Sequence, residues 1–219
     1  MRVLITGASR GLGMALAQYL TAEHTVYAWG SKQADFTCPV STWDTVPQVD
    51  AIVHCAGGGL GLKSPTPTAE ELYTLFMVNL GGQAEINRIA LQHATPPKYL
   101  CHVCSIVSGE AIGSVGYGTV KAALAGYIRA LGHQMARRGV VVTGIAPGAF
   151  VAPDNAMERL RVNSPAAYQD FLDRRLPRGV MGQAEEIIPL IEFLISPNAS
   201  MMGGAVVPID AGEGRYYAG

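Results

Sequence analysis

Segments with the apolar pattern of strands alternate with segments that have the spacing of helices along nearly the whole chain. Six apolar runs have the length of buried strands: 2–6, 25–29, 51–55, 100–104, 140–145 and 205–209. Helical spacing lies between them: 12–20, 68–76, about 117–138 and 184–195. Strands separated by helices form a parallel sheet with helices on both faces, because each crossover packs back onto the sheet. The sequence therefore predicts a doubly wound α/β fold.

Single residues and short motifs indicate where some of these elements begin, which side chains face inward and which strand lies at the sheet edge. Thr68-Ala69-Glu70-Glu71 has the pattern of a capping box, and Phe76 is expected on the inner face of the helix that follows. Tyr19 is expected on the inner face of the first helix. Pro189 should kink the late helix or mark a shifted start. Pro208 places the last strand at a sheet edge, since proline cannot donate to a ladder.

Composition bounds the function classes. The chain has 219 residues, of which 49% are hydrophobic and 15% charged, so one well-buried core is expected. The net charge is −1 and no basic cluster exceeds a pair, which argues against nucleic acid or an anionic membrane as a partner. A strand begins almost at the first residue and no apolar stretch reaches the roughly 18 residues of a membrane span. We expect a cytoplasmic protein.

Four cysteines raise the question of a metal or disulfide role. Cys101 and Cys104 lie three residues apart on one predicted strand. Their side chains therefore point to opposite faces and are about 10 Å apart, which is too far for a disulfide. The histidines have no paired ligand spacing of the zinc kinds. Buried thiols and no metal site are therefore the prediction for Cys38, Cys55, Cys101 and Cys104.

A glycine-rich turn, Thr6-Gly7-Ala8-Ser9-Arg10-Gly11-Leu12-Gly13, joins the first strand to the first helix. Glycines let the backbone approach a pyrophosphate, whose charge the amino end of a helix favours. The spacing is neither G-x-G-x-x-G nor a P-loop. Taken alone, such a turn could also be a tight connection without a ligand.

The turn and five later landmarks resemble the motifs of the short-chain dehydrogenase/reductase family, in the arrangement of its classical members. In chain order, these landmarks are Cys55-Ala56-Gly57, Val78-Asn79, Ser105 with Tyr117-Gly118-Thr119-Val120-Lys121, Pro147-Gly148, and Ile209-Asp210-Ala211-Gly212. Cys55 stands where the family has asparagine. The resemblance covers essentially the whole chain and implies a Rossmann-like fold, a nicotinamide cofactor and oxidoreductase activity.

The resemblance implies a catalytic set made of Asn79, Ser105, Tyr117 and Lys121. Tyr117 and Lys121 are four apart on a helix and share a face. A nearby ammonium favours the tyrosinate, so Tyr117 is the expected general acid/base. Lys121 would tune it and hold the nicotinamide ribose, Ser105 would bond the substrate oxygen, and Asn79 would hold a relay water. The alternatives are that Tyr117 is an aromatic residue at a helix start, that Lys121 is a solvated charge, and that Asn79 has a capping or interface role.

The catalytic serine has two candidates. Ser105 directly follows a strand, where a site residue should emerge, and lies twelve residues before Tyr117. This is one fewer than the usual family spacing. Ser108 lies nine residues before Tyr117. Ser105 is preferred, and Ser108 stays as the alternative.

The cofactor prediction is NADP(H) rather than NAD(H). Gly30-Ser31-Lys32 follows the second strand without a carboxylate for the adenosine ribose. Ser31, Lys32 and Arg10 could instead bind a 2′-phosphate. Asp35-Phe36 resembles the adenine-contacting pair, although 31–49 is short for the family. The remaining expected cofactor contacts are Gly7, Ser9, Gly11, Leu12, Gly13, Cys55, Ala56, Gly57, Tyr117, Lys121, Pro147, Gly148 and the backbone around Phe150.

The expected function is reduction of a ketone or oxidation of a secondary alcohol of small or medium size. One domain would span 1–219, with 1–110 mainly binding the cofactor, 111–219 supplying catalytic and substrate groups, and 149–180 covering the substrate. The resemblance implies a homotetramer or homodimer. The alternative is a non-catalytic NADP(H)-binding redox sensor, although such proteins tend to lose the tyrosine or lysine. A lyase or epimerase with an extended substrate domain would need a longer chain.

Overall fold

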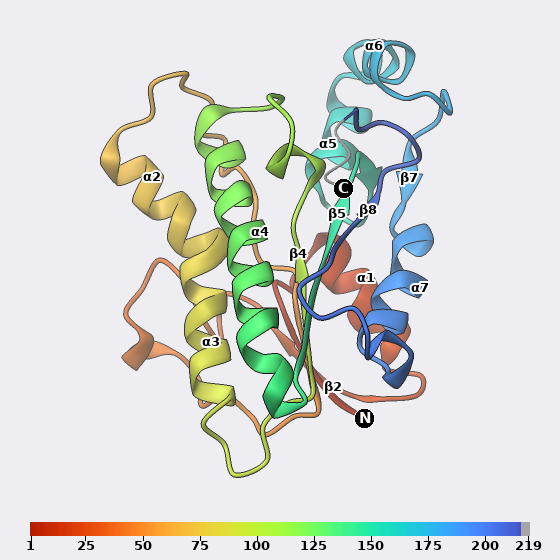
Figure 1. Cartoon of the computed structure of the whole chain (residues 1–219). Helices are drawn as coiled ribbons and strands as arrows, with labels where there is room; N and C mark the ends of the chain where they lie inside the picture. Colours follow the sequence, from red (N-terminus) through yellow and green to blue (C-terminus); the bar gives the residue numbers. More distant parts are fainter. Residues whose placement is uncertain (216–219) are drawn as a thin grey trace.

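The computed structural model describes residues 1–215, which fold around a six-stranded parallel sheet (Figure 1). The strands are β1 (Arg2–Thr6), β2 (Thr25–Trp29), β3 (Ala51–His54), β4 (Tyr99–Val103), β5 (Val141–Pro147) and β8 (Val206–Ile209). Their order across the sheet is β2-β1-β3-β4-β5-β8, with each neighbouring pair parallel. The order changes direction between β1 and β3, where doubly wound folds open a crevice at the carboxyl ends of the strands. The predicted fold is confirmed; residues 216–219 of the predicted domain lie outside the described residues.

Helices cover both faces of the sheet. Figure 1 shows α1 (Gly11–Leu20) and α7 (Ala184–Leu194) on one face. On the other lie α4 (Val115–Met135) and a continuous helix made of α2 (Ala69–Phe76), the π-helical η2 (Met77–Gly81) and α3 (Gly82–Ala90). Short 3₁₀ turns are η1 (Val40–Thr42), η3 (Ile106–Ser108), η4 (Ala136–Arg138) and η5 (Pro197–Ala199).

The segment expected to cover the substrate lies beyond the carboxyl ends of the strands (Figure 1). It contains β6 (Phe150–Val151), α5 (Ala156–Asn163) and α6 (Pro165–Arg175). β6 pairs with β7 (Gly182–Gln183), which precedes α7. This short ladder ties the segment back to the main domain.

The core has two halves separated by the sheet. Ile5 and Val53 are fully buried with the inner faces of α1 and α7, whereas Leu4 and Ile52 are buried with those of α3 and α4. Adjacent strand residues face opposite sides of a sheet. The strands are therefore apolar at successive positions because both sheet faces are covered.

Several local predictions hold. Thr68 accepts from the Glu71 amide while Glu71 accepts from the Thr68 amide, which completes the capping box. β8 lies at the sheet edge with Pro208 exposed. A shifted helix start, one of the two expectations for Pro189, is wrong, because this residue lies inside α7, which begins at Ala184; the kink stays a prediction. The proline ring is exposed, so water can reach the carbonyl that loses its helical partner.

Two inward-facing predictions are wrong. Tyr19 is 51% exposed, and its hydroxyl donates to Glu192 of α7 at 3.3 Å. Phe76 is 41% exposed, while Leu75 beside it is fully buried. Neighbouring helix positions point about 100° apart, so only one of that pair can occupy a narrow buried stripe.

The four cysteines carry free thiols. Cys101 and Cys104 are buried and Cys55 is half-buried, but the prediction of a buried thiol is wrong for Cys38, which is exposed. Burial raises the pKa of Cys101 to about 12. Within residues 1–215 there is no cluster of three or more His, Cys, Asp or Glu side chains able to hold a metal ion. None of the helices in the described part of the chain is long and apolar enough to cross a membrane.

Candidate active site

The glycine turn between β1 and α1 packs backbone against backbone. Gly7 and Gly11 have φ angles of +70° and +61°, in the left-handed region that glycine adopts without steric cost. A Cβ at Gly7 would lie 2.5 Å from the amide nitrogen of Ala56. A Cβ at Gly13 would overlap the carbonyl oxygen of Gly7. Only glycine fits at positions 7 and 13 at the switch point of the sheet.

The covering segment reaches this turn from the other side of the crevice. The Gly11 amide donates to the carbonyl oxygen of Pro153 at 2.6 Å. Asn155 then caps α5, because its side-chain oxygen accepts from the Glu158 amide while its nitrogen donates to the Phe150 carbonyl, both at 2.8 Å. Residues 150–155 therefore form a wall over the amino end of α1.

Cys55 lies on the inner side of the same turn. The Cys55 amide donates to the Thr6 carbonyl at 3.0 Å. A Cβ at Gly13 would lie 3.1 Å from the Cβ of Cys55. Burial raises the pKa of the Cys55 thiol far above its usual value. Cys55 is a neutral packing residue here.

The end of β2 presents exposed polar side chains. The Gly30 amide donates to the side-chain oxygen of Gln33 at 2.9 Å, and a Cβ at Gly30 would lie 3.2 Å from the Cβ of Ser9. Ser31, Lys32 and Arg10 are exposed around this point. Neither cation forms an ion pair within residues 1–215. Two free cations thus flank the end of β2 and the glycine turn.

The predicted adenine pair is engaged in other contacts. The Phe36 ring is 6% exposed and fills the space above Gly82, with the Trp43 ring centroid 5.2 Å away. The Asp35 carboxylate accepts from the hydroxyl and the amide of Thr37 at 2.7 and 2.9 Å. These bonds lower the pKa of Asp35. Phe36 therefore fastens the short 31–49 segment to α3, and its adenine contact stays a prediction.

Asn79 holds the turn that follows β3. Its side-chain oxygen accepts from the Gly58 amide at 2.9 Å, and its nitrogen donates to the carbonyls of Gly58 and Leu75 at 3.0 and 2.9 Å. Asn79 is fully buried and lies in the π-helical η2. Such widened turns are frequent at functional sites. The predicted site asparagine thus aims into the crevice region.

Lys121 and Tyr117 meet the same turn from α4. Lys121 is 2% exposed, and its Nζ donates to the Val103 carbonyl at 2.8 Å and lies 5.7 Å from the Tyr117 ring centroid. A Cβ at Gly57 would lie 3.2 Å from Lys121 Nζ and 2.8 Å from Asn79 Oδ1. A Cβ at Gly59 would lie 3.8 Å from Tyr117 Cβ. Three of the four predicted catalytic side chains therefore surround residues 57–59.

The two serines lie on different sides of η3. Ser105 follows β4 and begins η3, with its hydroxyl oxygen accepting from the Val107 amide at 3.4 Å. Ser108 lines a groove with Gly118 and Ala122, which lies between α4 and β8. Neither Tyr117 nor Lys121 lines this groove. Ser105 stays the preferred prediction for the catalytic serine.

A buried carboxylate that sequence reasoning missed holds the turn after β5. Glu213 is 7% exposed; its oxygens accept from the Ala149 amide at 2.6 Å and pair with Arg175 of α6 at 3.2 Å. A Cβ at Gly148 would lie 2.7 Å from the Glu213 carboxylate. Glu213 thus links the predicted Pro147–Phe150 contacts to α6. In the sequence, only the position of Glu213 directly after the landmark Ile209-Asp210-Ala211-Gly212 could have indicated that it belongs to the site.

The sequence profile of the family described as Enoyl-(Acyl carrier protein) reductase matches residues 40–213, well over half of the chain. The chain belongs to the short-chain dehydrogenase/reductase family. This predicted membership is confirmed and covers the region of Asn79, Ser105, Tyr117 and Lys121.

Relatives agree with this placement. The chain is 29% identical to 3-oxoacyl-acyl-carrier-protein reductase FabG of Pseudomonas aeruginosa, over 95% of each chain. It is 27% identical to short-chain reductase protein NovJ of Streptomyces niveus, over 96% of this chain and 92% of that protein. An actinorhodin polyketide ketoreductase structure with NADPH has the same fold, with a TM-score of 0.80 at 21% identity over 98% and 97% of the chains.

This short-chain dehydrogenase/reductase is accordingly an oxidoreductase of the kind that acts on CH–OH and C=O groups. The redox-sensor alternative is not favoured, because the matched relatives carry the names of reductases and dehydrogenases.

Proposed function

We propose that this enzyme is an NADP(H)-dependent ketone reductase for a small or medium organic substrate. The observation that carries the proposal is the meeting of Tyr117, Lys121 and Asn79 around residues 57–59, beside the Gly7 turn. This edge of a parallel sheet is where a doubly wound fold binds nucleotides.

The residues present fit a dinucleotide. A glycine cradle at 7–13 opens onto the amino end of α1, where the helix dipole favours a pyrophosphate. Arg10 and Lys32 are exposed without counter-ions in the described chain and suit a 2′-phosphate near Ser31. A solved 3-oxoacyl-acyl-carrier-protein reductase from Agrobacterium tumefaciens C58 carries NADP. When bound, NADPH supplies the hydride.

Protein side chains stabilise the charge that develops on the substrate oxygen and supply the proton that it takes up. Negative charge grows on the carbonyl oxygen during reduction, so a donor must stabilise it. Tyr117 donates the proton and Ser105 donates a hydrogen bond to the same oxygen. Lys121 favours the tyrosinate that results, through its nearby positive charge. Asn79 is proposed to hold a water that returns a proton to this pair.

The covering segment at 149–180 would close an apolar pocket. The support for this pocket is the position of the segment beyond the strand ends; the cavity of about 250 Å³ lined by Phe150, Leu176 and Arg178 is a separate space, because neither Tyr117 nor Lys121 lines it. We propose the division into a cofactor half at 1–110 and a catalytic half at 111–219, a cytoplasmic location, and a homotetramer or homodimer.

Purified enzyme incubated with NADPH and a panel of ketones and 3-oxoacyl thioesters tests this function. We expect loss of absorbance at 340 nm (the NADPH band) with some members, and a loss of turnover of at least about 100-fold in Tyr117→Phe. Tyr127→Phe on the same helix is the matched control and should retain turnover. Full activity of Tyr117→Phe would refute the acid assignment. Equal affinity for NADH would refute the role of Arg10 and Lys32.

A further inference from the structure

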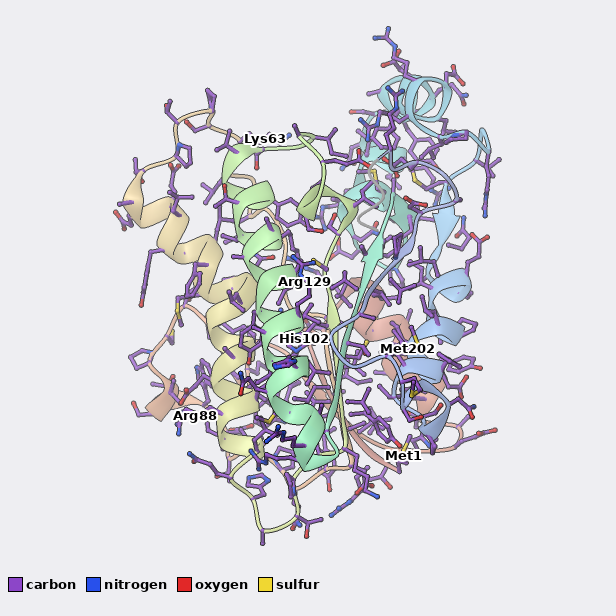
Figure 2. All side chains as sticks on the ribbon, viewed as in Figure 1. Met1, Lys63, Arg88, His102, Arg129 and Met202 are labelled. Atoms are coloured by element: carbon purple, nitrogen blue, oxygen red, sulfur yellow. The ribbon has the colours of Figure 1, made fainter. Side chains whose placement is uncertain are left out.

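A chain of buried polar side chains lies directly beneath the crevice, on the α3 and α4 face of the sheet. Its members are connected by successive hydrogen bonds and none is more than 2% exposed: Thr6, His54, Asn87, His102 and Gln83. It ends on the carbonyl of Ala56, to which Gln83 Nε2 donates at 2.9 Å. Figure 2 labels His102 between α4 and the strands. None of these side chains has a place in the proposed chemistry.

The Ala56 carbonyl determines the direction of the bonds nearest to it. A carbonyl can only accept, so Gln83 presents its nitrogen to Ala56 and its oxygen to His102 Nδ1 at 2.8 Å. His102 Nδ1 must therefore carry the proton. Its Nε2 then accepts from Asn87 Nδ2 at 3.3 Å, and the second Asn87 proton goes to the Tyr127 hydroxyl at 3.2 Å.

The hydrogen bonds on the other side of Asn87 lead to the glycine turn. Asn87 presents its oxygen to His54 Nε2 at 2.9 Å, so that nitrogen carries the proton. His54 Nδ1 is left to accept from the Thr6 hydroxyl at 3.2 Å. The rings of His54 and His102 are stacked with centroids 4.7 Å apart, an arrangement that suits neutral rings. Every donor is thus directed from Thr6 towards Ala56.

The hydrogen-bonded series of side chains ends at the Ala56 carbonyl, one peptide group before Gly57, which lies beside the predicted catalytic residues. The Ala56 amide lies against Gly7, and Gly57 lies against Lys121 Nζ. Asn79 already holds Gly58, and Gln83 lies four residues further along the same continuous helix. Two amide side chains therefore hold successive peptide groups of one turn.

We propose that Gln83, oriented by His102, is a positioning residue that fixes the Ala56–Gly59 turn for cofactor binding. The proposal rests on the proposed function, because it assigns the turn to the nicotinamide cofactor. Without Gln83 the inward Ala56 carbonyl has no donor, and the turn can shift away from Gly7 and Lys121. Loss of a donor to such a carbonyl corresponds to a factor of about ten or more in an equilibrium.

Calorimetric titration of the full-length protein with NADPH tests the proposal. In Gln83→Leu the Kd should rise about tenfold, with kcat at saturating cofactor changed by less than about threefold. Tyr127→Phe is the matched control, since it removes only a side branch at Asn87, in the middle of the series, and leaves the turn alone; its Kd should stay within about twofold. Similar Kd values for Gln83→Leu and wild type, or for Gln83→Leu and Tyr127→Phe, would overturn the proposal.

Gln83→Glu separates positioning from packing, because the new carboxyl has the same size and donates only when protonated. The titratable groups around it are His102 of β4, which bonds to Gln83, and His54 of β3 and Lys121 of α4, which both act on His102. Because burial raises the pKa of a carboxyl at this fully buried position, we expect near wild-type NADPH affinity at pH 5.5 and about tenfold weaker binding at pH 8.5. A ratio to wild type that stays constant with pH would contradict a donor role for Gln83.

Hydrogen exchange of the free protein keeps this test independent of the proposed function. Peptides covering 56–62 should exchange faster in Gln83→Leu than in Tyr127→Phe. If wild type binds no nicotinamide cofactor, the proposed function fails and so does the cofactor role of the turn. The exchange comparison then decides separately whether Gln83 holds it.

Discussion

The close backbone contact at Gly7 can be tested by separating its two physical parts. A side chain there meets a left-handed φ of +70° and three backbone atoms of Cys55 and Ala56 within 2.8 Å. Gly139 has nearly the same φ, +68°, with nothing within 4 Å of its Cβ position. Gly13 has the overlap, against Gly7, without a left-handed φ. Gly139→Ala therefore adds backbone strain alone, and Gly13→Ala adds steric overlap alone. Gly7→Ala adds both.

The expected losses follow from these contacts. Left-handed alanine costs about 1 kcal/mol, so Gly139→Ala should lose about that much unfolding free energy. Overpacking costs about 1–3 kcal/mol, and this is the expectation for Gly13→Ala. Gly7→Ala should lose about 2–4 kcal/mol, because its obstacles are backbone atoms that cannot rotate away. The entropy that alanine removes from the unfolded chain is common to all three and cancels in the comparison.

Urea unfolding gives the stability values, and NADPH titration reports on the crevice. Gly139 precedes β5 at the amino ends of the strands, so its variant should bind NADPH like wild type. Gly7→Ala should bind at least about tenfold more weakly, since the turn must move. If Gly7→Ala is no less stable than Gly139→Ala, the close backbone contact does not exist as described.

Two further predictions concern buried titratable groups. Burial lowers the pKa of His54 to about 4 and that of His102 well below its usual value, whereas both rings take up protons near pH 6.5 when unfolded. The unfolded chain therefore binds more protons in acid, and stability should fall by about 2 kcal/mol per ring between pH 7 and pH 5, measured by urea unfolding; a flat profile would contradict a neutral network. An aromatic disulfide reagent should modify the exposed Cys38 rapidly and the other three thiols only on unfolding. Rapid reaction of the half-buried Cys55, whose thiol pKa is raised by burial, would contradict its packing role.

Most of the fold could be predicted because its signals are local. Val3-Leu4-Ile5 is apolar at consecutive positions, which only a strand covered on both faces requires, and Thr68 with Glu71 marks a helix start. The glycine turn could be predicted because close backbone contacts exclude side chains. Tyr19 was placed wrongly because it lies at the border of an apolar stripe, where spacing alone cannot distinguish core from rim.

The polar features beneath the crevice could not be predicted in the same way. His54 and His102 are 48 residues apart in sequence, and only the β3–β4 register brings their rings together. Gln83 and Asn87 resemble ordinary solvent-facing helix residues until the sheet is placed under them. The π-helical turn at Asn79 adds no recognisable spacing to the sequence.

The bond between the Gly11 amide and the Pro153 carbonyl has a consequence for the order of events at this site. An amide hydrogen serves one strong acceptor at a time. A phosphate oxygen can use Gly11 only after the 150–155 wall has released it. In the proposed cofactor complex, arrival of the dinucleotide and displacement of residues 150–155 from Gly11 are then a single exchange of acceptors.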